Sequence, residues 1–172
     1  MVSLDNFYRR IDLINNWLDN IQDKRLFYGR TDKCYIVKKI TKGNVEREVK
    51  EDGSFKVTFL VEGLLSDPEE TELEISNNFS LEYLGTEKAL PKLEIFANGN
   101  IQIQFNDANI QIDNVDEFVK INSESKEFLN KDLTSKDLDS QGSFPILVPG
   151  TNTISWTGNI SSMILKFSQK YR

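Results

Sequence analysis

The chain has 172 residues, enough for one compact domain or two small ones, and its 38% hydrophobic and 28% charged residues are typical of a folded domain. The net charge of −6 disfavours a protein that binds nucleic-acid phosphates, because such binding needs clustered positive charge. Histidine is absent, which excludes histidine-based triads and metal sites, and Cys34 is the only cysteine, which excludes an internal disulfide or a CxxC pair.

The sequence carries no signal for export or membrane insertion. The first residues, MVSLDN, lack the basic and apolar regions of a cleaved signal peptide. No segment approaches the ~18 consecutive apolar residues of a membrane helix. We therefore expect synthesis in the cytoplasm without a signal peptide, and neither a membrane nor a nucleic acid as a partner.

The first predicted element is a helix over residues 4–21. Apolar residues recur there at spacings of three and four, at Leu4, Phe7, Ile11, Ile14, Leu18 and Ile21. This spacing places them in one stripe along five helical turns, with Ser3 as the N-cap. Leu13 and Trp17 widen the stripe, so we expect the helix to pack on a sheet through Phe7, Ile11, Ile14 and Leu18. A coiled coil is the alternative.

The residues after the helix predict an antiparallel sheet. Residues 25–28 and 34–40 are β-prone and flank a turn at 29–32. EDGS at 51–54 predicts a hairpin turn of the Asp-Gly kind. The segment FKVTFLV at 55–61 alternates, which places Phe55, Val57, Phe59 and Val61 on one face.

Residues 65–78 predict a junction, because Ser66 to Glu70 break regular structure. From residue 79 onward the chain is nearly all β. Strands are predicted at 81–84, 93–96, 101–105, 109–112, 118–121, 127–129, 144–147, 153–156 and 163–167, with turns at 97–100, 106–108 and 149–150. The expected fold class is mainly β. A helix packed on an antiparallel sheet (residues 1–68) is followed by an antiparallel β-sandwich or jelly roll (residues 69–172).

Candidate catalytic or metal-binding groups are better explained as surface turns. Acidic residues cluster at Asp113, Asp116 and Glu117 and again at 137–139, but nothing in the sequence perturbs them. The run NDAN at 106–109 lacks the spacing of an EF-hand. SESK at 123–126 matches Ser-x-x-Lys but lies between strands rather than on a helix. We therefore predict no enzyme activity, no catalytic residue, no cofactor and no metal.

Several segments along the chain resemble the distal tail proteins of long-tailed, non-contractile bacteriophages and their prophages. In the first part they are IDLINNWL (11–18), RLFY (25–28), CYIV (34–37) and GSFKVTF (53–59). In the second part they are GTEKALPKLEI (85–95), NGN (98–100) and GSFPILVPGTNTI (142–154). The order of these segments carries the resemblance, which covers nearly the whole chain.

The resemblance implies two domains: a partial N-terminal ring domain at residues 1–68 and a galectin-like β-sandwich at 69–172. It implies a structural component of the tail tip or baseplate, a hub that joins the tail tube to tip proteins in the virion. The implied partners are the tail tube, the tape measure, a tail-associated lysin or receptor-binding protein, and further copies of the chain. Relatives begin with additional strands before the helix, so this chain resembles a form shortened at its N-terminus.

Two sets of residues follow as candidate contacts. Five of the six arginines, Arg9, Arg10, Arg25, Arg30 and Arg47, lie in the first part, and arginine is enriched at protein interfaces. We therefore expect self-association through residues 1–66.

The alternative function is a carbohydrate-binding adhesion module for the host cell surface, with Trp156 as the sugar platform. Because no polar constellation accompanies Trp156, we expect no saccharide to bind with a Kd below about 1 mM.

Overall fold

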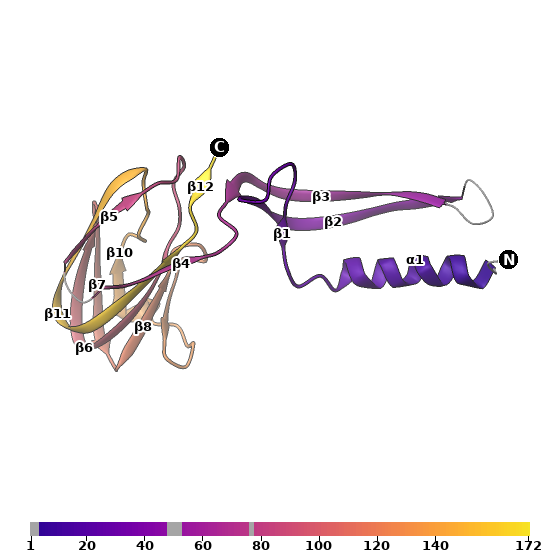
Figure 1. Ribbon diagram of the computed structural model, residues 1–172. Coiled ribbons are helices and arrows are strands. Elements are labelled where there is room, and N and C mark those ends of the chain that lie inside the picture. Colours follow the sequence, from indigo (N-terminus) through magenta and orange to yellow (C-terminus); the bar gives the residue numbers. More distant parts are fainter. Residues whose placement is uncertain (1–3, 48–52, 76–77) are drawn as a thin grey trace. The chain divides into compact units, whose positions relative to one another are not determined.

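The computed structural model describes residues 4–47, 53–75 and 78–172. The chain divides into two compact units, unit 1 (residues 1–65) and unit 2 (residues 66–172), and each is described by itself (Figure 1). The predicted mainly β fold with an N-terminal helix and antiparallel sheets is confirmed. Among the described residues, no helix has both the length and the apolar character needed to cross a membrane.

Unit 1 consists of one helix and a small sheet. Its elements are α1 (Leu4–Asp19), β1 (Arg25–Leu26), β2 (Cys34–Arg47) and β3 (Gly53–Ser66). β1 pairs antiparallel with β2, and β3 lies on the other side of β2. The helix ends two residues before its predicted end, where the Asn20 side-chain amide donates to the carbonyl oxygen of Asn16 at 2.7 Å. The predicted N-cap Ser3 and the first half of the predicted hairpin turn, residues 51–52, lie outside the described residues, and residues 53–54 begin β3.

The helix contacts the sheet mainly through its C-terminal end. Leu18 is 5% exposed, and Lys42 of β2 binds Asp19 at 2.7 Å. Phe7 and Ile11 are half-buried, but Ile14 is 39% exposed, so the prediction that it is buried is wrong. The alternation in β3 is confirmed, because its odd-numbered residues from 55 to 61 are half-buried, whereas the even-numbered residues from 56 to 60 are exposed.

Unit 2 is built from antiparallel strands in the order β10-β7-β6-β11-β4, with β5 paired to β11, β8 to β6 and β9 to β8. The strands of this sheet are β4 (Thr71–Ile75), β5 (Phe79–Tyr83), β6 (Lys92–Phe105), β7 (Ala108–Val115), β8 (Phe118–Asn122), β9 (Glu127–Asn130), β10 (Ser140–Gly142) and β11 (Gly150–Phe167). The short strand β12 (Lys170–Tyr171) follows and is not part of it. A 3-10 turn, η1 (Asp137–Asp139), precedes β10.

Two pairs of predicted strands are single long strands. The predicted strands at 93–96 and 101–105 both belong to β6, and those at 153–156 and 163–167 both belong to β11. The first part of β6 pairs with β8, and the last part pairs with β7. The sheet therefore folds over on itself (Figure 1). Side chains of β7 and β8 are buried in one core cluster.

Irregular pairing keeps apolar side chains inside the fold of the sheet. Even-numbered residues are buried at the start of β11, including Asn152 and Ile154, whereas odd-numbered Met163 and Leu165 are buried near its end. Register shifts at 157–159 and 160–162 produce this change of side. Gly158 has φ +100°, and a Cβ on it would lie 2.6 Å from the Asn100 carbonyl oxygen. The bend therefore requires glycine at that position.

Two further expectations for unit 2 are wrong. Residues 71–75 form β4 rather than part of a junction, because Leu73 and Ile75 pack inward while Glu72 and Glu74 are exposed. Residues 144–147 do not form a regular strand, although Leu147 makes an isolated bridge with Ala89.

The VPG turn at 148–150, part of the resemblance to tail proteins, is held by one buried amide. The side-chain oxygen of Asn152 accepts hydrogen bonds from the backbone N–H of Val148 at 2.9 Å and the Asn106 amide at 2.8 Å. Its nitrogen donates to the carbonyl oxygens of Val148 and Gly150 at 2.8 and 2.9 Å. Asn152 is fully buried, and these four bonds satisfy all of its hydrogen-bonding groups.

The outer surface of the sandwich differs between its two layers. Over β4, β11, β6 and β8, Lys166 pairs with Glu72 and Glu94, and Glu94 pairs with Lys120, at 3.1–3.2 Å. Burial alone would raise the pKa of Glu94, but hydrogen bonds from both lysines outweigh it and lower the pKa. Over β6, β7 and β10 the surface carries glutamines 102, 111 and 141 opposite one another instead. Gln111 also donates a hydrogen bond to the carboxylate of Asp113 at 3.2 Å.

The packing of α1 can be tested with two leucines of the same helix. Leu18→Ala should lower the free energy of unfolding by about 2–5 kcal/mol, because it removes a packed side chain. Leu13, which is 60% exposed, is the control, and Leu13→Ala should cost less than ~0.5 kcal/mol. Hydrogen exchange of the β2 and β3 amides would measure both losses. Equal effects of the two substitutions would contradict this packing.

The bend of the sheet can be tested with two glycines. Both Gly158 and Gly99 have positive φ, so alanine at either should cost about 1–3 kcal/mol in backbone strain. Only at position 158 does the added Cβ meet a backbone atom, so Gly158→Ala should be clearly the more destabilising in urea denaturation. An equal or smaller loss for Gly158→Ala would show that the close approach to Asn100 is not a constraint.

Candidate subunit-contact surface

The helix carries a second stripe, largely apolar, that stays exposed beside its buried side. Arg10, Leu13, Ile14 and Trp17 follow one another at spacings of three, one and three, so they lie on one side of α1. All four are exposed, Leu13 by 60% and Trp17 by 63%. We call these four residues the Trp17 stripe. They correct the expectation that Leu13 and Trp17 help the helix pack on its own sheet.

The stripe ends at a hollow of about 700 Å³ within unit 1. The helix end contributes Trp17 and Leu18, and the strands contribute Leu26, Val37, Ile40 and Phe59. Lys24, Arg25, Lys38 and Lys39 line its basic side, and Asp19 and Asp23 add acidic groups. An apolar hollow with a charged rim, next to exposed aromatic and aliphatic side chains, has the composition of a protein-binding surface.

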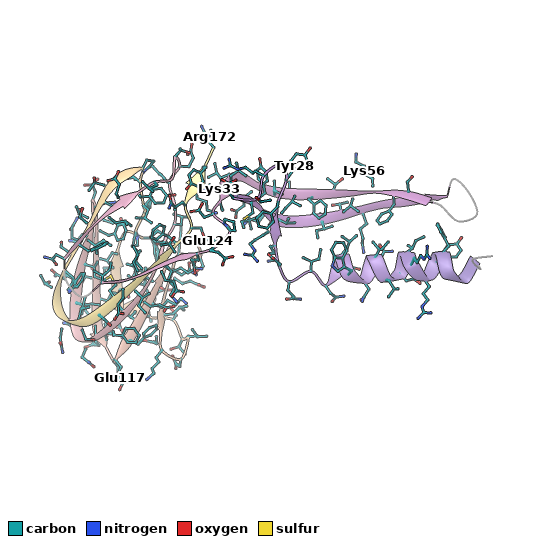
Figure 2. The ribbon with its side chains drawn as sticks, in the orientation of Figure 1. Tyr28, Lys33, Lys56, Glu117, Glu124 and Arg172 are labelled. Atoms are coloured by element: carbon teal, nitrogen blue, oxygen red, sulfur yellow. The ribbon has the colours of Figure 1, made fainter. Side chains whose placement is uncertain are left out.

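Two more aromatic side chains lie on the connection between β1 and β2. Phe27 is 44% exposed and Tyr28 is 80% exposed. Tyr28 is labelled in Figure 2. Exposed single apolar residues are common, but unit 1 concentrates them on α1 and on this connection.

The five arginines lie on separate elements. Arg9 and Arg10 are exposed on α1, and Arg47 ends β2, where side chains are outside the description. Arg25 is paired with Asp23 at 2.9 Å, and Arg30 is paired with Asp32. Of the five, Arg10 belongs to the Trp17 stripe and Arg25 lines the hollow. A role for them in an interface stays a prediction.

Hydrogen bonds from arginine lower the pKa of two aspartates. The hydrogen bond from the Arg30 guanidinium lowers the pKa of Asp32 to about 2, and the bond from Arg25 lowers the pKa of Asp23. Both carboxylates therefore stay ionised well below neutral pH, and each neutralises its arginine.

Trp156, the sugar platform of the alternative reading, is half-buried in β11 and packs against the core of unit 2. Its role as a platform stays a prediction.

The acidic candidates Asp113, Asp116 and Glu117 lie at the end of β7 and in the turn that follows. Within the described parts of the chain, no three His, Cys, Asp or Glu side chains gather in a way that would hold a metal ion.

The Trp17 stripe is the feature that the sequence interpretation missed. Its signal was present, because apolar residues occupy more of the helix circumference than one buried face needs. Which of the two stripes packs on the sheet depends on the path of the chain after Asp19, and the residue spacing carries no information about that path.

Comparisons with known proteins reveal a shared fold. No family model matches the chain, and no curated protein matches it. Among solved structures, the chain is similar to the Dit protein of SPP1, described as a paradigm of the hub adsorption apparatus in phages that infect Gram-positive bacteria. The TM-score is 0.64 and the sequence identity is 12%, over 99% of this chain and 74% of that one. The likeness shows that the two proteins share a fold.

The Arg30–Asp32 pair can be tested by titration. Arg30→Gln removes the donor that stabilises the carboxylate, so the pKa of Asp32 should rise from about 2 toward its ordinary value of 3.8. At pH 3 the carboxyl group should then change from ionised to mostly protonated, as measured by NMR of its carbon. Asp23 is the control, because its pKa is lowered by Arg25 and should not move. An unchanged Asp32 titration would contradict the pairing.

Proposed function

We propose that this chain is a structural component of a phage or prophage tail, located at the tail tip or baseplate. In this proposal it is a hub that joins the tail tube to the tip proteins and acts by binding rather than by catalysis. Support comes from the likeness in fold to SPP1 Dit, which extends over 99% of the chain and so includes both units. The protein to which the chain is similar is itself described as part of a hub.

The observation that carries the proposal is the Trp17 stripe. Tryptophan and arginine dominate the binding energy of protein interfaces, and both occur here beside exposed Leu13 and Ile14. On this side of α1 the apolar groups remain in water within the single chain, and a partner would remove them from it. Unit 1 is therefore the proposed contact domain, corresponding to the partial ring domain of the tail-protein resemblance.

Unit 2 is proposed to lie outside the ring as a galectin-like domain. Its core is closed by its own strands, with twenty buried apolar residues in one cluster. The ion pairs over β4, β11, β6 and β8 favour contact of that layer with water, because covering charged groups is costly. The tail tube, tape measure, and lysin or receptor-binding protein remain the proposed partners of the whole chain.

Light scattering on a sizing column tests the contact surface. The chain should be a monomer or a weak oligomer at micromolar concentration, with a mass that rises at higher concentration. Trp17→Ser combined with Leu13→Ser should weaken self-association about tenfold or more, because it removes the apolar centre of the contact. Leu84→Ser in unit 2 replaces a leucine that is 68% exposed and is the control.

The proposed contact would be wrong if the double variant associated like the unaltered chain, or if Leu84→Ser alone abolished association. A chain that stays monomeric up to about 1 mM would contradict self-association through unit 1.

A further inference from the structure

Unit 2 contains a second hollow, of about 520 Å³, where β6 and β11 bend. It is lined by Phe96 and Asn98 of β6, Glu117 and Phe118 at the start of β8, Lys131 after β9, and Ser161 of β11. Its volume falls in the range of about 300–1,000 Å³ that is typical of small-molecule sites. We call it the Phe96 hollow.

One wall of the hollow is aromatic. Phe96 and Phe118 are directly opposite on β6 and β8, and their rings meet edge to face with centroids 5.3 Å apart. Phe96 is 39% exposed, whereas its neighbours Ile95 and Ala97 on the same strand are buried in the core. The Phe96 ring is therefore on the outer side of the sheet, where part of it is available to a ligand.

The polar groups of the hollow are held in place by the backbone. Glu117 adopts φ +61°, a conformation that is costly for a residue other than glycine and that recurs at ligand-binding positions. Its N–H donates to the Asn98 side-chain oxygen at 3.2 Å, and its carbonyl oxygen accepts from Ala97 at 3.1 Å. Ser161 donates to the carbonyl oxygen of Phe96 at 3.0 Å, which fixes its hydroxyl oxygen as an acceptor.

The charges of the hollow neutralise each other. Lys131 binds the Glu117 carboxylate at 2.8 Å, and both side chains are exposed at the edge of the unit, as Figure 2 shows for Glu117. A paired carboxylate and ammonium still offer a second acceptor oxygen and further N–H donors. The site therefore presents donors and acceptors together without the net charge that would select an ion.

We propose that the Phe96 hollow binds a neutral saccharide. The apolar C–H face of a pyranose ring would stack on Phe96, and its hydroxyl groups, which donate and accept, would bond to Asn98, Glu117, Lys131 and Ser161. A protein segment is a weaker fit, because the hollow lacks the extended apolar lining that a peptide anchor needs. The site lies within unit 2, so its test is independent of association through unit 1.

NMR titration of the full chain tests the proposal, with glucose, galactose and N-acetylglucosamine as neutral probes and glucuronate and glucosamine as charged ones. Sugars should be added to about 100 mM, because binding weaker than about 1 mM is expected. Saturable shifts should appear at the backbone amides of the lining residues with at least one neutral sugar. Phe96→Ala should weaken binding about tenfold or more. Phe79→Ala is the matched control, because Phe79 is 37% exposed elsewhere in unit 2.

A second variant keeps the test decisive if Phe96→Ala does not fold. Lys131→Gln changes a side chain that is 72% exposed, leaves Glu117 unpaired, and should also weaken binding of the neutral sugar. The proposal is overturned if no neutral sugar causes shifts, if the shifts map elsewhere, if only charged sugars bind, or if Phe79→Ala weakens binding as much as Phe96→Ala.

Discussion

Unit 2 depends on two strands that are long enough to belong to both layers of the sandwich. β6 and β11 pair with each other over most of their length, and each changes its other neighbour at the bend. The bend must turn the sheet while keeping apolar side chains inside, which the register shifts around Gly99 and Gly158 achieve. The Phe96 hollow lies where this bend brings β6, β8 and β11 together, so it is a consequence of the same constraint.

Unit 1 faces a different physical problem, because a single helix and a small sheet bury little apolar surface. Leu18 is the one residue of α1 that is buried among those whose side chains are described. The helix therefore leaves Leu13 and Trp17 in water, at a cost that a partner protein would remove. Unit 2 closes its core with its own strands, whereas unit 1 leaves the Trp17 stripe exposed. This contrast supports the proposal that the protein assembles through unit 1.

The two units distribute their charged groups differently. In unit 1, Arg25 and Arg30 are each neutralised by an aspartate two residues away. In unit 2, one outer surface carries ion pairs between strands and the other carries uncharged glutamines, as at positions 102 and 111. Exposed ion pairs add little stability, but they keep a surface in contact with water, and a row of amides is less costly to cover.

The fold class, the helix and the inward residues of most strands follow from the sequence alone, because periods of 3.6 and 2 are properties of local backbone geometry. The sequence also located the segments that resemble tail proteins. That residues 97–100 continue a strand follows from the pairing of distant segments, because Asn and Gly residues occur both in a bend within a strand and in a turn. Tertiary structure likewise decided which stripe of α1 stays exposed, and it brought Phe96, Glu117, Lys131 and Ser161 together from four separate segments. Such contacts depend on strand pairing over long sequence separations, which no local pattern encodes.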